Sequence, residues 1–473
     1  MLAGNTTLVH QKSKMLKIER TYLEAFILTL IFTFSPVKTA GVIAPYFILL
    51  WFMIRSGSGI TFKNTTLFIT LYLILIAFYT FFLKTVYDRQ FMILNAVISL
   101  VTYSSLIFYF VVPSPNIRLN YDKYFNILTY VLVIEGVIGV IQYAFVKLFN
   151  FDMLAGDAVQ GTIGLTAFLG QAGFGNQMFC INLSFILIFY IPYYFYKNPT
   201  KLRLLLVPIT ALLLAAVIHV QISLFIAFFV SLLMISKLSI KNYVRFTLIG
   251  GIITLTFFML LTVALPGITT TASIYLSKYE EGSSPKLESV ETVFSEVAYR
   301  YPYMYIFGTG PGQYSSRAGL ISSGYYFGND RVNALIRKTS FGNNFLFNEN
   351  FKDLWFSYSE KSDKYGNSTV HRPFFSILSF IVEFGLLATL VTAIVLINRL
   401  YKCKRVLTKL NGPAINNSND FDPRIPFAIS WFLSVSFIIC ISSFENYLET
   451  SQAVFLGFLL MKLFNPIYIP SRR

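Results

Sequence analysis

The stretch TTLFITLYLILIAFYTFFLK (residues 65–84) decides the class of this protein, because it carries no charge before Lys84. A helix that crosses the hydrocarbon core of a bilayer needs about 20 such residues. Runs of similar character recur along the chain, which is 55% hydrophobic and only 13% charged. Soluble domains of this size do not use such a balance. The sequence therefore predicts an all-α polytopic membrane protein.

Twelve apolar runs are candidates for membrane spans, ten of them long and two short. The long runs are residues 65–84, 91–112, 125–149, 176–196, 203–219, 222–236, 246–265, 374–399, 427–443 and 452–465, and the short runs are 21–35 and 41–54. The short pair forms either two thin spans or one re-entrant hairpin. Both alternatives give an even number of crossings, so we expect about twelve transmembrane helices and both termini on one side.

Lysine and arginine predict which side that is, because short basic loops stay in the cytoplasm. The N-terminal segment, the stretch YKCKRVLTK (401–409) and the C-terminal Arg472 and Arg473 are all basic. With the termini inside, the net charge of +16 is a topology signal spread over many loops. It is not a nucleic-acid surface, which would cluster basic and aromatic residues. The expected partner is the lipid bilayer, with no nucleic acid.

This threading divides the chain into five parts, one of them large enough for a separate outer domain. The parts are a cytoplasmic tail (1–20), an N-terminal transmembrane bundle (21–265), an extracytoplasmic loop domain (266–372), C-terminal transmembrane helices (373–465) and a second cytoplasmic tail (466–473). The loop domain is rich in Tyr, Asn, Ser and Gly, which suits contact with sugars. An ordinary solvated loop with interfacial aromatic residues is the alternative.

The stretch FGTGPGQYSSR (307–317) spaces Gly308, Gly310 and Gly312 two apart, like a phosphate-binding loop. A nucleotide loop would need a preceding strand, a following helix and a compartment that contains nucleotides. The predicted outer location excludes that. The glycines either form a tight turn, which we favour, or leave backbone amides free for an anionic ligand.

Three stretches resemble the O-antigen polymerase and O-antigen ligase superfamily. They are GQAGFGNQM (170–178), IFGTGPGQY (306–314) and HRPFFSILSFIVEFGLLATL (371–390), and their order and placement carry the resemblance. It implies a C-type glycosyltransferase fold in a bacterial inner membrane. The implied donor is an undecaprenyl-diphosphate-linked oligosaccharide, used outside the cytoplasm without a nucleotide sugar, a metal or a cofactor. A chain-length regulator protein is an implied partner.

Two departures favour the polymerases over the ligases. Ligase-like members usually carry a Ser-Arg pair where this chain has HVQIS (219–223), and an arginine upstream of the glycine motif where this chain has ESVETVFSE (288–296). The nearest arginine to the second position is Arg300. The resemblance leaves the ligase reaction, transfer of glycan to lipid A core, as an alternative.

Arginines near the two motifs are the candidate donor site. A lipid diphosphate needs guanidinium groups, whose planar fork binds phosphate oxygens in pairs and stays charged in a partly dry site. Arg300, Arg317 and Arg372 flank the motifs and are the predicted diphosphate-binding residues. Gly308, Gly310 and Gly312 would support them. The alternative for each arginine is a solvated or ion-paired loop residue.

His371 is the candidate catalytic base, because it lies at the mouth of the 374–399 span and matches the histidine of the resembled family. By position alone it could be a polar helix cap. Glu383 and Glu135 are acids at membrane depth, where an ionisable side chain is a functional hypothesis. Glu383 is about 18 Å of helix away from His371. We interpret it as a supporting residue bonded within the bundle.

The remaining motifs predict no metal, and two classes of function stay open. Cys180, Cys403 and Cys440 are dispersed over spans and a cytoplasmic loop, which is not a metal-ligand set. A glycosyltransferase fits the large outer domain. A flippase for lipid-linked glycans would have short outer loops and charged side chains along a central cavity.

The topology is directly testable. Reporter fusions at Gly282 and Gly412 should report an extracytoplasmic and a cytoplasmic position respectively, because the lopsided distribution of basic residues places 266–372 outside. The reverse pattern would remove the donor site from the compartment where the proposed chemistry occurs.

Overall fold

The structure is a computed structural model, and it describes ten stretches of the chain. They are residues 2–55, 59–117, 119–149, 156–169, 175–235, 285–325, 334–336, 345–360, 373–410 and 421–469. Every regular element named within them is a helix. The predicted span 246–265 lies outside the described residues, as do His371 and Arg372.

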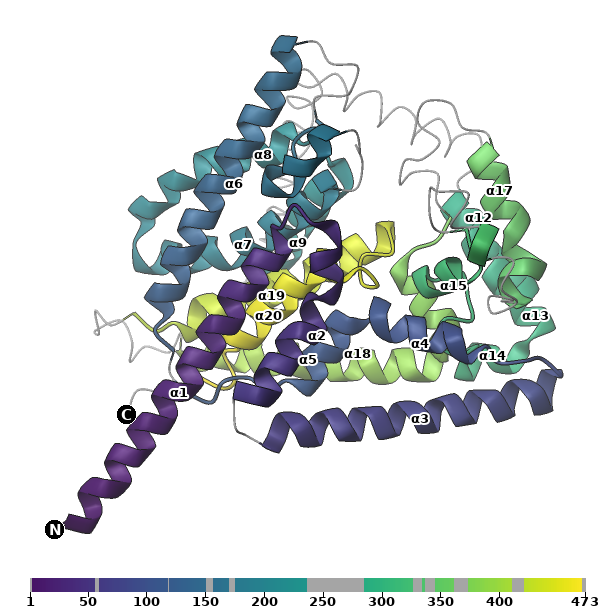
Figure 1. Cartoon of the computed structure of the whole chain (residues 1–473), viewed down its shortest axis with the longest axis horizontal. Helices are drawn as coiled ribbons and strands as arrows, with labels where there is room; N and C mark the ends of the chain where they lie inside the picture. The colour runs from purple at the N-terminus through teal and green to yellow at the C-terminus, as the bar shows by residue number, and fades with distance from the viewer. Residues whose placement is uncertain are drawn as a thin grey trace, which may run out of the picture.

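The helices fall into an N-terminal series, a middle series and a C-terminal series (Figure 1). The middle series is called the outer series, because the sequence predicts that its segment lies outside the cytoplasm. The N-terminal series is α1 (Leu2–Thr33), α2 (Lys38–Arg55), α3 (Gly59–Tyr87), α4 (Ile93–Thr102), α5 (Ser104–Val111), α6 (Tyr121–Phe149), η1 (Gly161–Leu169), α7 (Gly175–Lys197), η2 (Pro199–Leu205), α8 (Leu206–Leu214) and α9 (Ile218–Ile235). The outer series is α12 (Pro285–Thr292), η3 (Val293–Val297), α13 (Ala298–Arg300), α14 (Pro302–Phe307), α15 (Arg317–Ser322), η5 (Phe347–Phe351) and α17 (Lys352–Glu360). The C-terminal series is α18 (Ser376–Leu410), α19 (Arg424–Phe444) and α20 (Ser451–Leu463).

Five of the described helices are long and apolar enough to cross a membrane, or six if the bent pair α4 and α5 counts as one span. The five are α3, α6, α7, α18 and α19. Three shorter apolar helices accompany them, within α2, α9 and α20. This set suggests a multi-pass membrane protein, as the sequence predicts. The described residues do not amount to twelve spans.

Two predicted spans are interrupted. The run 91–112 bends by 70° at Tyr103. On the α4 side of the bend, the hydroxyls of Ser99 and Thr102 donate to carbonyls three residues earlier, at 2.8 and 3.2 Å, and such bonds divert backbone acceptors and bend helices. The run 203–219 breaks where Ala216 adopts a φ of 54°. The Gln221 side-chain amide donates to the Leu212 carbonyl at 2.8 Å, which satisfies the end of α8.

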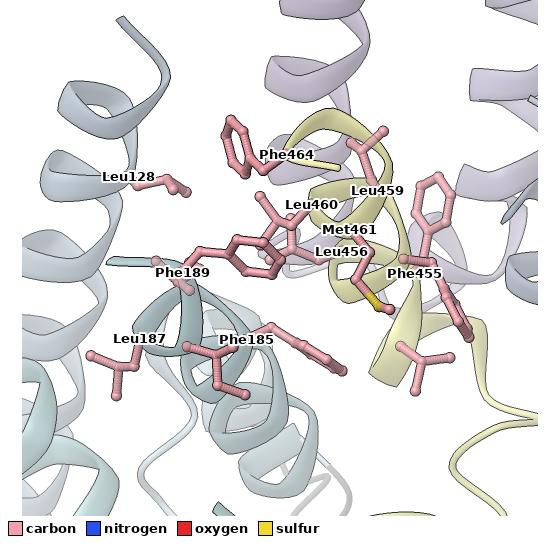
Figure 2. Close-up of a cluster of buried hydrophobic side chains, with 14 of the residues drawn as sticks. Leu128, Phe185, Leu187, Phe189, Phe455, Leu456, Leu459, Leu460, Met461 and Phe464 are labelled. Atoms are coloured by element: carbon pink, nitrogen blue, oxygen red, sulfur yellow. The ribbon is translucent and has the colours of Figure 1, made fainter. Parts of the chain in front are cut away.

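The main core lies where α7 and α20 pack together. Figure 2 shows Phe185 and Phe189 of α7 facing Leu456 and Leu460 of α20, with Leu128 of α6 beside them. All five side chains are at most 1% exposed. Dense apolar packing of this kind fixes the relative positions of the helices.

Helices α3 and α18 present apolar side chains to their surroundings. In the most apolar window of α7, 89% of the residues are buried, against 17% in those of α3 and α18. The apolar side chains of α3 that are more than half exposed include Leu67, Leu73, Ile74 and Phe81. An uninterrupted apolar flank of this length fits lipid and does not fit water.

A second core joins the outer helices to α3 and α18. Tyr314 packs edge-on against Phe351 and Phe374, with ring centroids 5.0 and 5.9 Å apart. Phe374 also stacks on Trp355 at 5.7 Å. Figure 1 shows α12 to α17 gathered at one end of α3 and α18. The described part of the outer segment is therefore built against the bundle.

Two backbone hydrogen bonds, called the joint below, hold the glycine stretch (residues 307–317) against α18. This helix is broken at Gly385, where φ is 76° and ψ is 169°. Two carbonyls just before the break, those of Val382 and Glu383, accept hydrogen bonds from the amides of Thr309 and Gly310, both at 2.9 Å. The loop thus replaces donors that a continuous helix would have supplied.

Close approach explains the glycines on both sides of this joint. Gly308, Gly310 and Gly312 have φ values of 84°, 96° and 72°, which favour glycine. A Cβ on Gly308 would lie 2.3 Å from the Glu383 carbonyl oxygen, and one on Gly385 would lie 2.3 Å from the Ile306 carbonyl oxygen. The glycines therefore form a tight turn, and the amides of Thr309 and Gly310 donate to α18.

Alanine substitutions test the joint. Gly308→Ala and Gly385→Ala should each destabilise the protein by roughly 2–4 kcal/mol, because an unfavourable φ is combined with a backbone clash. Thermal unfolding in detergent measures the effect. Gly59→Ala is the matched control, since a Cβ there meets no atom within 4 Å. Equal unfolding temperatures for all three variants would contradict the joint.

Candidate functional site

The turn between α19 and α20, residues 445–450, is where helix ends from distant parts of the chain meet. Ser376, the first residue of α18, donates its amide to the Glu445 carbonyl at 3.3 Å, and its hydroxyl accepts from the Leu448 amide at 3.0 Å. The hydroxyl of Tyr447 lies 2.6 Å from Nε2 of His219 at the start of α9. It donates to Oε1 of Gln177 at the start of α7, at 3.1 Å.

Arg317 extends this meeting point to the glycine stretch. Its backbone amide donates to Oε2 of Glu449 at 2.5 Å, and its guanidinium Nη1 donates to the hydroxyl of Thr450. Ser316 caps the short helix α15 by accepting from the Gly319 amide at 3.3 Å. The glycine stretch therefore ends with an arginine whose side chain is half-buried and held at the 445–450 turn.

Two carboxyl groups lie close together in the interior, and one of them, that of Glu449, contacts Arg317. Glu383 is 0% exposed and Glu449 is 1% exposed. Burial, reinforced by the nearby charge of Glu383, raises the pKa of Glu449 to about 8, although its contact with Arg317 acts in the opposite direction. Tyr103 and Tyr314 are buried close to both acids. Glu383 and Glu449 are called the acid pair below.

Side-chain amides lock the glycine stretch to the beginning of α4. Nδ2 of Asn95 donates to the Gly312 carbonyl at 3.0 Å. Gln313 accepts from the Met92 amide at 3.1 Å and donates to the Met92 carbonyl at 2.9 Å, as a neighbouring strand would. Both side chains are fully buried. This arrangement fixes the residues of the glycine stretch that precede Arg317.

The predicted site residues do not all gather at one place. Arg317 contacts Glu449 of the acid pair, whereas Arg300 is exposed at the end of α13. His371 and Arg372 lie outside the described residues. Glu383 is connected to the loop by its backbone carbonyl, and its carboxylate faces Ser316 without a hydrogen bond of normal geometry.

Several residues at the site were missed by the sequence reasoning. Glu449 is the principal one, and the signal was the stretch FENYLET (444–450), which places acids between two apolar helices. Glu445 is also buried there, with its Oε1 3.8 Å from the amine of Lys286 in α12. That ion pair ties the outer helices to the turn.

Glu135, the other acid at membrane depth, is separate from this cluster in its contacts. Its carboxylate accepts from the amide and the hydroxyl of Thr162, at 2.8 and 2.5 Å. Gln142, on the same helix, binds the backbone of Gly161 in both directions at 2.8 Å. These contacts hold the start of η1 against α6, which is a structural task.

Comparison with known proteins gives no relative: no family model, curated protein or solved structure matches this chain. Among the described residues, no group of three His, Cys, Asp or Glu side chains could hold a metal ion. The function is therefore argued from the residues and their geometry.

Proposed function

We propose that this protein is a membrane glycosyltransferase that polymerises undecaprenyl-diphosphate-linked oligosaccharide repeats into O-antigen or a related surface polysaccharide. One observation carries the proposal. The glycine stretch and the beginning of α18, which hold two of the three family-like motifs, are joined by backbone hydrogen bonds although more than 70 residues separate them. Arg317 is the last residue of the glycine stretch and lies at the end of the bundle, where a lipid-borne diphosphate would arrive.

The proposed topology has about twelve spans in a bacterial inner membrane, with both termini in the cytoplasm. It is supported by the helix ends that meet at the 445–450 turn. The starts of α7, α9 and α18 and the end of α19 are all ends that the threading assigns to the outer side. Contacts of Ser376, His219 and Gln177 with this turn bring them together. The undescribed 246–265 run supplies one further proposed span.

The proposed chemistry is a single displacement without a metal or cofactor. Guanidinium groups of Arg300, Arg317 and Arg372 would hold the diphosphate as it leaves the anomeric carbon. His371 would take the proton from the attacking sugar hydroxyl. Inversion at the anomeric carbon follows from one displacement. The proposed assembly also includes a chain-length regulator protein.

The O-antigen ligase reaction differs only in its acceptor, which is lipid A core. A flippase for lipid-linked glycans is the second candidate, and the acid pair is the observation that favours it. Buried ionisable groups inside a helical bundle are typical of transport pathways and proton relays. The size of the outer segment and its joint with α18 favour the polymerase.

The reaction itself can be tested with purified protein in nanodiscs and the lipid-linked repeat unit alone. Chain growth without lipid A is the expected result. Arg317→Lys and Arg317→Ala should lose most of this activity, because an ammonium group cannot replace the bidentate contact. Thr450→Val is the control, since it removes the neighbouring hydroxyl and keeps the guanidinium. Growth only with lipid A would indicate the ligase, and transport without growth the flippase.

His371→Ala should slow chain growth by about 10²- to 10⁴-fold while donor binding stays near normal, as expected for loss of a general base. Single-turnover rates and donor affinity measured on the same preparation separate these effects. His219→Ala should instead lower the unfolding temperature and keep the rate per folded protein, because His219 is buried against Tyr447. If His371→Ala works at the wild-type rate, Asp330 and Asp353 are the next candidates.

A further inference from the structure

The acid pair lies between the two cores, where several helices close around it. Glu383 is on α18 just before its break, and Glu449 is in the turn before α20. Arg317 and Ser316 approach from the glycine stretch, and Ser379 approaches from α18. Tyrosine side chains face the pair from α3, from the bend after α4 and from the glycine stretch; they are Tyr72, Tyr79, Tyr103 and Tyr314.

Charge balance in this interior requires a proton. Two neighbouring carboxylates that are both withdrawn from water cannot both stay ionised, because each raises the energy of the other in a medium of low dielectric constant. Among the described residues, Arg317 is the cation whose charge acts on Glu449. The tyrosines ordinarily titrate near pH 10 and contribute no charge at neutral pH. The charge of Arg317 balances one carboxylate, so charge balance requires the other carboxyl group to hold a proton.

Hydrogen-bond geometry supports the same conclusion. Neither oxygen of the Glu383 carboxyl group has a hydrogen-bond partner of normal geometry among the described residues, and the same holds for Oε1 of Glu449 and the hydroxyl of Ser379. The hydroxyl of Ser316 and the amides of Gly312 and Tyr314 lie beside the Glu383 carboxyl group, and the hydroxyl of Ser379 lies beside Glu449. A buried carboxylate normally has several aligned donors.

We propose that Glu383 and Glu449 form a proton-binding site that holds one exchangeable proton at neutral pH. The site lies in the joint between the outer segment and the bundle, since Glu383 supplies a backbone acceptor to Gly310 and Glu449 accepts from Arg317. Loss of the proton places two negative charges side by side and loosens this joint. The inference does not depend on which reaction the protein catalyses.

The sign of the pH dependence follows from linkage. Glu449 has an ordinary pKa of 4.5 and a pKa of about 8 in the folded protein. Between these values the folded state holds a proton that the unfolded chain has released. Stability therefore falls as the pH rises through this window, and the fall ends once the folded state also releases the proton.

Thermal unfolding in nanodiscs across the range from about pH 5 to about pH 9 tests the site. The wild type should lose stability with rising pH at a slope equivalent to about one proton. Glu383→Gln and Glu449→Gln mimic the protonated group, so each should flatten this slope. Glu349→Gln is the control, because Glu349 is partly exposed and paired with Arg89, and it should keep the wild-type slope. Wild-type slopes in both acid-pair variants would overturn the proposal.

Infrared spectroscopy of the wild type keeps the test valid if the variants fail to fold. A carboxylic-acid band should be present at neutral pH and disappear above about pH 9. Glu135→Gln identifies any contribution from the separate acid on α6. A spectrum with no carboxylic-acid band beyond the Glu135 contribution would overturn the proposal, whatever the result of the enzymatic assays.

Discussion

Two backbone hydrogen bonds, from the amides of Thr309 and Gly310 to the carbonyls of Val382 and Glu383, connect the described outer segment to the bundle. They require α18 to be broken at Gly385 and the loop to approach at Gly308, since both positions lack room for a Cβ. A membrane-embedded helix can leave its carbonyls unpaired only where other protein groups satisfy them. The break and the glycine stretch are therefore two halves of one feature.

This joint organises the polar interior of the protein. It brings Arg317 to the turn before α20 and places Glu383 next to Glu449. The surrounding cores are apolar and tightly packed, which keeps the local dielectric constant low and makes each charge there energetically important. The ion pair of Lys286 with Glu445 at the same turn adds a further connection between the outer helices and the bundle.

The proposed transferase and the proposed proton site use the same architecture in different ways. The transferase needs a fixed arginine at the end of the bundle, where lipid-borne substrate would meet the outer segment. The proton site needs two carboxyl groups that water reaches poorly. Arg317 serves both, because its guanidinium is half-buried while its backbone amide contacts Glu449. A change in the protonation of the acid pair would therefore change the electrostatic environment of Arg317.

The sequence by itself predicted the helices of the described residues that are long and apolar enough to cross a membrane, because long apolar runs have few other stable environments. It also singled out Gly308, Gly310 and Gly312 as turn residues, which their spacing and positive φ values explain. It did not reveal the bend at Tyr103, the break at Gly385 or the partnership of Glu383 with Glu449. Those depend on side-chain hydroxyls, backbone carbonyls and buried charges contributed by segments far apart in the chain. Hydrophobic periodicity reports which residues avoid water, whereas only the packed structure decides which distant polar groups must satisfy one another.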